Sequence, residues 1–125
     1  MLIDSDVLIW YIRGNKNAQR AVNNNMPFKI SVINYMEVIQ GMKDKKELKS
    51  FQNYLKKWSV EIMQINETIS TRAMFLVEDY FLSSSLELGD AIIASTALEN
   101  QEIVLTGNDK HYKCIPNIQI QKFKP

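Results

Sequence analysis

The feature that most constrains the fold of this chain is a regular alternation of short apolar segments with longer amphipathic ones. Segments typical of β-strands lie at residues 1–4, 28–33, 60–65, 102–106 and 118–121. Segments typical of helices lie at residues 7–12, 16–22, 34–42, 46–58, 68–82 and from about residue 89. Parallel strands need such crossovers, because each strand must return to the same edge of the sheet. We therefore expect an α/β fold, a three-layer sandwich with a mainly parallel central sheet covered by helices on both faces.

Length and composition narrow the class of protein. The chain has 125 residues and no repeat or linker, so we expect a single domain over residues 1–125. The formal net charge of +1 excludes a bulk polycation, so a nucleic-acid partner must be held by local patches. No apolar run reaches the roughly 18 residues of a membrane span, and the N-terminus does not resemble a signal peptide. The single cysteine, Cys114, fits a reducing compartment, and we expect a cytoplasmic protein without a membrane partner.

Acidic residues follow the predicted strands or begin the predicted helices. Asp4 and Asp6 follow the first strand, Glu37 follows the second, Asp90 begins a helix, and Asp109 follows the fourth strand. Open parallel sheets place their functional sites beyond the carboxyl ends of the strands, so these acids are expected to converge. Each also has an ordinary interpretation: Asp90 suits a helix cap or a partner of the helix dipole, and Asp6 is favoured as the cap of the first helix. Asp109 alone would be an unremarkable loop acid.

A cluster of carboxylates indicates a specific chemistry. Such a cluster repels itself and raises its own pKa values unless a cation compensates. Carboxylate oxygens suit Mg²⁺ or Mn²⁺, and one histidine and one cysteine are too few for a structural zinc site. A divalent ion held in this way activates water and stabilises charge on a phosphodiester. The sequence contains neither the GxSxG motif of serine hydrolases nor the Gly-rich loop of P-loop nucleotide hydrolases.

Four segments carry a family resemblance, which extends from Leu2 to about Ile118. They read MLIDSDVLIWYIRGN, SVINYMEVIQG, LGDAIIASTALEN and IVLTGNDKHYKCI. In order and spacing they resemble the motifs of PIN-domain ribonucleases, and in particular the VapC-type toxins of type II toxin–antitoxin pairs. The resemblance implies a PIN-like sandwich, commonly a homodimer, that hydrolyses RNA with Mg²⁺. It also implies a cognate antitoxin protein as partner.

The resemblance assigns roles to individual residues. The first aspartate of the family falls on Asp4, its glutamate on Glu37, and its third acid on Asp90. Metal coordination is carried over chiefly to Asp4 and Asp90, with Glu37 helping directly or through water. Ser31 takes a flanking supporting position, and Asp6 is a further supporting residue.

The fourth position of the resemblance has two candidates. Counting forward from Thr106 selects Asn108, whereas a shorter spacing counted back from Tyr112 selects Asp109. Asn108 is slightly favoured, with Asp109 near the rim, and either side chain is a candidate to orient metal-bound water. Thr106 is expected to hydrogen-bond the acids from the end of its strand.

Basic and aromatic residues suggest where partners bind. The candidates for contact with RNA are Arg13 and Lys16 after the first helix, and Lys43 and Lys46 in a lysine-rich segment. For this segment a solvated helix face is the favoured interpretation. Trp10 lies on the first helix, where the family often meets its antitoxin. His111, by contrast, has no evident carboxylate to orient it and is expected at the surface or in contact with RNA.

Two other functions compete with the nuclease. The DSD sequence after the first strand mimics the nucleophile motif of haloacid-dehalogenase-type phosphatases, but Leu8 stands where that motif has Thr or Val. A non-catalytic PIN-like binding domain would keep the fold and use its cleft to hold a partner. The intact acids at Asp4, Glu37 and Asp90 argue against this second alternative.

Overall fold

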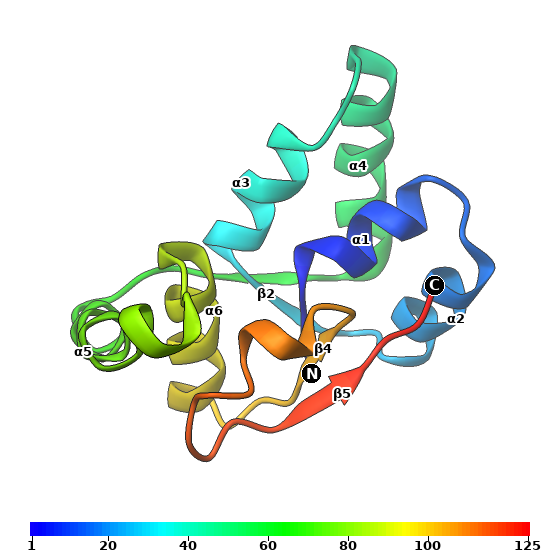
Figure 1. The fold of residues 1–125 in the computed structure, drawn as a ribbon. Coiled ribbons are helices and arrows are strands. Elements are labelled where there is room, and N and C mark those ends of the chain that lie inside the picture. Colours follow the sequence, from blue (N-terminus) through cyan, green and yellow to red (C-terminus); the bar gives the residue numbers. More distant parts are fainter.

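A computed structural model describes residues 1–125 and shows a five-stranded, all-parallel sheet with six α-helices (Figure 1). The strands are β1 (Leu2–Ile3), β2 (Lys29–Ser31), β3 (Glu61–Met63), β4 (Val104–Thr106) and β5 (Ile120–Lys122), and their order in the sheet is β3-β2-β1-β4-β5. The helices are α1 (Ser5–Ile12), α2 (Lys16–Asn24), α3 (Val32–Gln40), α4 (Lys45–Trp58), α5 (Glu67–Ser84) and α6 (Leu88–Glu99). A short 3₁₀ helix, η1 (Asp109–His111), follows β4. The predicted α/β sandwich with a parallel sheet is confirmed.

Neighbouring residues of the central strands pack into different cores, because side chains alternate across a strand. Ile3 and Leu105 belong to a core formed with α1, α2, α3 and α4, whereas Leu2 and Val104 belong to a second core formed with α5 and α6. The sheet is thus the middle layer of three.

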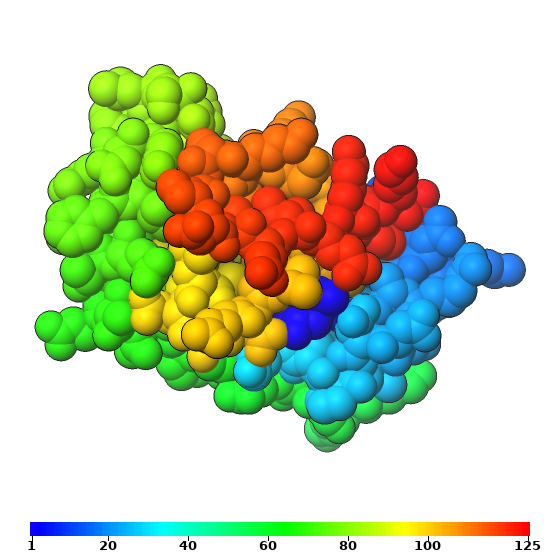
Figure 2. Space-filling view, turned by 90° about the horizontal axis from the view of Figure 1, so that it is seen from below, coloured from blue at the N-terminus to red at the C-terminus, as the bar shows by residue number.

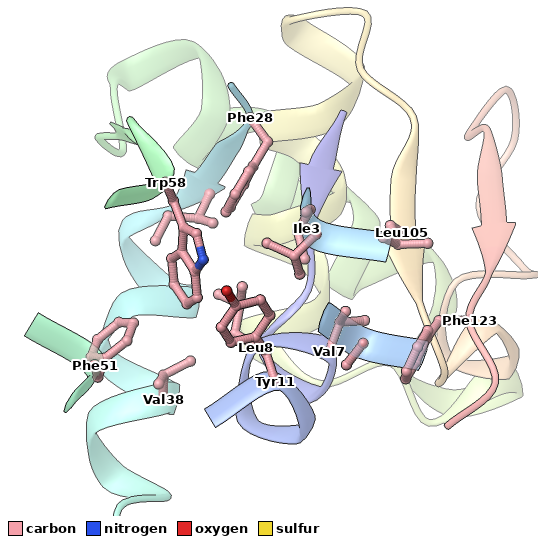
Figure 3. Packing of buried hydrophobic residues seen from close by; sticks show 13 residues of the cluster. Ile3, Val7, Leu8, Tyr11, Phe28, Val38, Phe51, Trp58, Leu105 and Phe123 are labelled. Atoms are coloured by element: carbon pink, nitrogen blue, oxygen red, sulfur yellow. The ribbon is translucent and has the colours of Figure 1, made fainter. Parts of the chain in front are cut away.

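The first core is rich in aromatic side chains, which Figure 3 shows converging beside β1 and β2. Trp58 is fully buried, and its ring lies edge-on to Tyr11, with centroids 5.0 Å apart and an interplanar angle of 88°. Phe51 and Phe28 lie close to the same indole. These contacts fix α1 against α4, and α1 begins at the edge of the sheet where the acids lie.

The boundary between β2 and α3 differs from the prediction. Alternation through Phe28, Ile30 and Val32 favoured a strand to residue 33 and a helix from residue 34, but the strand ends at Ser31 and the helix begins at Val32. The Ser31 hydroxyl accepts from the Ile33 amide, and the Asn34 side chain accepts from the Ser31 amide at 2.8 Å, which together cap the helix. This local cap overrides the alternating pattern.

The parallel arrangement brings the carboxyl ends of β1, β2 and β4 to one edge of the sheet. Asp4 directly follows β1, Ser31 ends β2, and Thr106 ends β4. No helix of the structure has both the length and the apolar character that crossing a membrane requires.

Candidate active site

Asp4 is the centre of a buried hydrogen-bond network at this edge. Its Oδ1 accepts from the backbone amide of Ser5 at 2.8 Å and from the Asn34 side-chain amide at 3.1 Å. Its Oδ2 accepts from the Thr106 hydroxyl at 2.8 Å and from the Tyr112 hydroxyl at 2.9 Å. The donors come from four different parts of the chain, and Asp4 is only 6% exposed. The carboxylate is therefore held in one orientation, and its charge is stabilised by four donors.

A pocket of about 240 Å³ opens beside Asp4. Its lining is mostly acidic and polar, with one histidine and one apolar residue; it consists of Asp4, Ser5, Asp6, Ile9, Glu37, Glu87, Asp90, Asn108 and His111. The structure thus brings together the three acids that the resemblance singles out, from three different helices or helix caps. Glu87 and Ser5 were not identified from the sequence.

Glu37 lies on the second turn of α3 and faces Asp4 through Ser5. The Ser5 hydroxyl donates to Glu37 Oε1 at 2.5 Å, while the Ser5 amide donates to Asp4. Burial raises the pKa of Glu37, the Ser5 hydrogen bond opposes this, and the negative charges of Asp4 and Asp90 add to the increase. Glu37 therefore takes up a proton more readily than an exposed glutamate does.

Asp90 lies in the first turn of α6, where its charge suits the helix dipole, but it is not the helix cap. Glu87 occupies the N-cap position, and the Asp90 carboxylate lines the pocket. Burial raises the pKa of Asp90, His111 opposes the increase, and the charge of Asp4 adds to it. Asp90 receives no hydrogen bond from a side chain.

Asp6 is not the cap of α1 either, because Asp4 holds that position. Instead, Asp6 joins α1 to the loop after β4: its Oδ2 accepts from the Gly107 amide at 2.8 Å. Its Oδ1 is buried and has no hydrogen-bond partner. Burial, with the nearby charge of Asp4, raises the pKa of Asp6 to about 6. A Cβ on Gly107 would lie 2.6 Å from Asp6 Oδ2, so this contact requires a glycine.

The two candidates for the fourth position occupy different surroundings. Asn108 lines the pocket. The Asp109 carboxylate lies 3.4 Å from Lys113 Nζ and 3.6 Å from Lys122 Nζ, outside the residues that line the pocket. Desolvation opposes ionisation of Asp109, but the two ammonium groups outweigh it and lower the pKa. The geometry thus favours Asn108.

His111 is exposed, as expected, and it also lines the pocket. The loop itself offers no carboxylate, but Nδ1 of His111 lies 3.7 Å from Asp90 Oδ1 on α6. The turn of η1 brings the two residues together, although they are far apart in the chain. This contact was not predicted from the sequence.

The supporting residues act mainly through Asp4. Thr106 donates to Asp4 as expected, and its hydroxyl also accepts from the Asn108 amide at 2.9 Å. Ser31 is fully buried and does not line the pocket; its backbone amide holds the side chain of Asn34, which in turn donates to Asp4. Asn34 carries a signal in the sequence, because it is a polar residue on the otherwise apolar segment SVINYM, whereas no such signal marks Tyr112.

None of the basic residues predicted to contact RNA lines the pocket. Arg13 and Lys43 lie where α1 and α3 end, and both are engaged: Arg13 Nη2 donates to the Gly41 carbonyl at 3.1 Å, and both side chains lie within 4.0 Å of Glu47. Lys16 is the first residue of α2, and Lys46 is the second residue of α4. Figure 1 shows the turn between α3 and α4 far from η1 and β5.

The donor set of the pocket fits a hard divalent cation. It offers carboxylate and amide oxygens, and the raised pKa values of Glu37 and Asp90 reflect burial and negative charge that a cation would relieve. No three His, Cys, Asp or Glu side chains are arranged to enclose a metal ion together. Mg²⁺ does not need such an enclosure, because it is commonly bound through one or two carboxylates and keeps several waters.

Comparison with known proteins decides the family. The PIN domain family matches residues 1–115. This chain belongs to the PIN domain family. Members of this family are generally nucleases. Among curated proteins, no significant match is found.

Solved structures place this PIN domain beside toxin–antitoxin proteins. It is similar to a chain of a toxin–antitoxin complex from Klebsiella pneumoniae, with 30% sequence identity, a TM-score of 0.75 and coverage of 94% of this chain and 93% of that chain. It is also similar in fold to VapBC-1 from nontypeable Haemophilus influenzae (20% identity, TM-score 0.76, coverage 97% and 96%). DNA-bound VapBC from Salmonella typhimurium gives 20% identity, a TM-score of 0.80 and coverage of 97% and 96%. The resemblance to VapC-type PIN domains is confirmed.

Proposed function

We propose that this PIN domain is a Mg²⁺-dependent endoribonuclease and the toxin of a toxin–antitoxin pair. The observation that carries the proposal is the acidic pocket, in which Glu37 and Asp90 lie beside an Asp4 carboxylate fixed by four donors. Mn²⁺ has the same preference for oxygen ligands and would substitute for Mg²⁺.

The residues of the pocket have separate roles in this proposal. Asp4 and Asp90 would hold the ion, with Glu37 as a third ligand, directly or through water. When bound, the ion supplies activation of water and neutralisation of charge on the phosphodiester. Glu37 Oε1, whose pKa is raised by burial, would accept the proton of the attacking water. The Asn108 side chain, neutral and at the rim of the pocket, would orient this water without adding repulsion to the phosphate.

The antitoxin is proposed from the comparisons and from one surface feature. The structure from Klebsiella pneumoniae that shares 30% identity with this chain is a toxin–antitoxin complex. On α1, Trp10 is 43% exposed, whereas its neighbour Tyr11 is buried in the aromatic core. An exposed indole on a helix beside the pocket suits a protein partner that covers the site.

A homodimer is proposed from a second, apolar surface on α5 and α6. Large apolar side chains are exposed there, and Met74 and Leu88 line an apolar hollow between the two helices. The exposed members of this surface are Met74, Phe75, Phe81, Leu82 and Leu88. Apolar surface of this kind is a common mark of a protein interface. Sedimentation velocity should give the mass of a dimer, and a monomer at micromolar concentration would contradict this assembly.

The test of the nuclease is RNA cleavage by Asp90→Asn, because Asn keeps the shape of the side chain and removes its charge. We expect a loss of at least about 100-fold in Mg²⁺-dependent cleavage, in line with the loss of a group that stabilises transition-state charge. Asp79→Asn, on the exposed face of α5, serves as matched control and should cleave like the wild type. Separate Asn108→Ala and Asp109→Ala variants then locate the fourth position, and the larger loss is expected for Asn108.

The alternatives make different predictions in the same assay. A PIN-like binding domain would give neither heat on titration with Mn²⁺ nor EDTA-sensitive cleavage of RNA. The family match leaves the dehalogenase-type phosphatase without support. Full activity of Asp90→Asn would remove Asp90 from the mechanism.

A further inference from the structure

The positive charge of this protein is concentrated at its C-terminal end. Residues 107–125 contain four lysines and one acid, Asp109, which gives this segment a net charge of +3. Because the whole chain carries +1, residues 1–106 together carry −2. The basic residues of this segment are Lys110, Lys113, Lys122 and Lys124, and all four are exposed.

The first two lysines belong to the same loop as the rim of the pocket. Lys110 lies within η1, between Asn108 and His111, which both line the pocket. Lys113 follows one residue after the buried Tyr112, whose hydroxyl donates to Asp4. Tyr112 therefore anchors the loop at the site, and the lysines on either side of it point to the outside.

The other two lysines reach the site through pairing of the last two strands. Lys122 is in register with Thr106, and the Phe123 amide donates to the Thr106 carbonyl at 2.8 Å. The Phe123 carbonyl approaches Gly107 so closely that a Cβ there would lie 3.4 Å from it. Lys124 thus follows directly on a residue that touches the loop of the pocket.

One acid, Asp109, contacts lysines from both the loop after β4 and the C-terminal strand. Asp109 lies between Lys113 and Lys122, at 3.4 and 3.6 Å from their ammonium groups. Figure 2 shows the orange loop after β4 and the red C-terminal strand as neighbouring parts of one surface. Lys110 and Lys124 have no ion-pair partner in the structure, so their charge is fully available.

An acidic pocket needs a basic surface beside it to bind a polyanionic substrate. Five carboxylates line it, and a polyanionic substrate is repelled by them over distances up to the Debye length, about 8 Å at physiological ionic strength. A basic surface at the rim offsets this repulsion and holds the phosphates on either side of the bond that is cleaved. By contrast, Arg13 and Lys43, at the ends of α1 and α3, do not line the pocket, and both lie within 4.0 Å of Glu47.

We propose that Lys110, Lys113, Lys122 and Lys124 form a binding surface for the phosphate backbone of single-stranded RNA, and that this surface leads the substrate into the acidic pocket. The proposal rests on the proposed nuclease function, since it names how that site meets its substrate. It replaces Arg13, Lys16, Lys43 and Lys46 as the principal RNA contacts.

The test is the salt dependence of RNA binding in an Asp90→Asn background without added metal, which prevents cleavage. Fluorescence anisotropy with a mixed-sequence single-stranded RNA gives the affinity at several KCl concentrations. Three double variants are compared, all of which change exposed lysines to glutamine: Lys110→Gln with Lys124→Gln, Lys43→Gln with Lys46→Gln, and, as a control at the far end of α4, Lys56→Gln with Lys57→Gln.

The expected result is specific to one variant. Removing Lys110 and Lys124 should reduce the magnitude of the negative slope of log affinity against log salt by about 1.4, because each phosphate contact with a single strand contributes about 0.7. The control should keep the parental slope. An unchanged slope for the first variant, a larger loss for the Lys43 and Lys46 variant, or a parent that binds no RNA at low salt would overturn the proposal. The first of these is also the outcome expected if the lysines serve an acidic protein partner.

The nuclease proposal is judged separately. Mg²⁺-dependent cleavage by the wild-type chain decides it, whichever lysines bind the substrate. Cleavage that persists while the slope is unchanged would reject the binding surface alone.

Discussion

The most informative single substitution is Asp6→Asn, measured in EDTA as a function of pH. Asp6 is mostly buried next to Asp4, and its pKa is raised from 3.8 to about 6. The folded protein therefore binds this proton more tightly than the unfolded chain does. The contribution of Asp6 to stability falls as pH rises between about 4 and about 6, and the full penalty is present above pH 6.

The magnitude follows from the size of the pKa increase. A difference of about two pKa units corresponds to about 3 kcal/mol, at roughly 1.4 kcal/mol for each unit. Because part of the side chain still meets solvent, we reduce this to about 2 kcal/mol. Asparagine carries no charge and keeps an oxygen that can accept from the Gly107 amide, as Asp6 Oδ2 does at 2.8 Å.

Urea unfolding of both proteins between pH 4 and pH 8 measures this effect. We expect Asp6→Asn to be more stable than the wild type by about 2 kcal/mol at pH 7.5 and by less than about 1 kcal/mol at pH 4. Asp79→Asn, which changes an exposed acid, should follow the wild type at every pH. A difference that does not depend on pH, or a wild type that is the more stable protein at pH 7.5, would refute the reasoning.

Two further substitutions test the contacts around the site. Gly107→Ala places a Cβ 2.6 Å from Asp6 Oδ2, so the carboxylate must turn away and lose its backbone donor. Thermal unfolding should show that the free energy of unfolding falls by about 1–3 kcal/mol. An unchanged melting temperature would show that the loop adapts without cost. Tyr112→Phe removes one of four donors to the buried Asp4 carboxylate while keeping the ring. It should lower the free energy of unfolding at pH 7 by about 1.5–3 kcal/mol, and a loss below about 0.5 kcal/mol would mean that the phenol is not a significant donor to the anion.

Much of the fold follows from patterns that the sequence displays directly. The alternation of apolar strands with amphipathic helices predicts a parallel sheet, and parallel strands place Asp4 and Thr106 at one edge. The approach of Asp4, Glu37 and Asp90 to one pocket was expected for this reason and from the family resemblance. Their roles in catalysis remain predictions.

Details that depend on side-chain geometry were not predictable. Asp4, not Asp6, caps α1, because the carboxylate of the residue before the helix is the one that reaches the Ser5 amide. His111 meets Asp90 only because a 3₁₀ turn follows β4, and no periodic pattern marks so short an element. Such contacts are set by the packing of the whole chain.

The basic surface formed by the C-terminal lysines was not predictable from the sequence either. Reading along the chain draws attention to the run that contains Lys43 and Lys46, because its lysines are consecutive or nearly so. Lys110 lies in the loop after β4, whereas Lys124 follows β5. Lys124 lies next to this loop only because β5 pairs with β4. Clusters made by strand pairing are invisible to a search for charged runs.

In the proposed function, the acids of the pocket hold a divalent ion that serves phosphodiester hydrolysis. The most direct test of this role is a crystal grown with Mn²⁺ and measured for anomalous scattering. We predict one or more strong anomalous peaks inside the pocket, in contact with both Asp4 and Asp90, and their loss in crystals of Asp90→Asn. Saturating Mn²⁺ that gives no peak between these two carboxylates, or peaks only elsewhere on the surface, would contradict the proposed metal site.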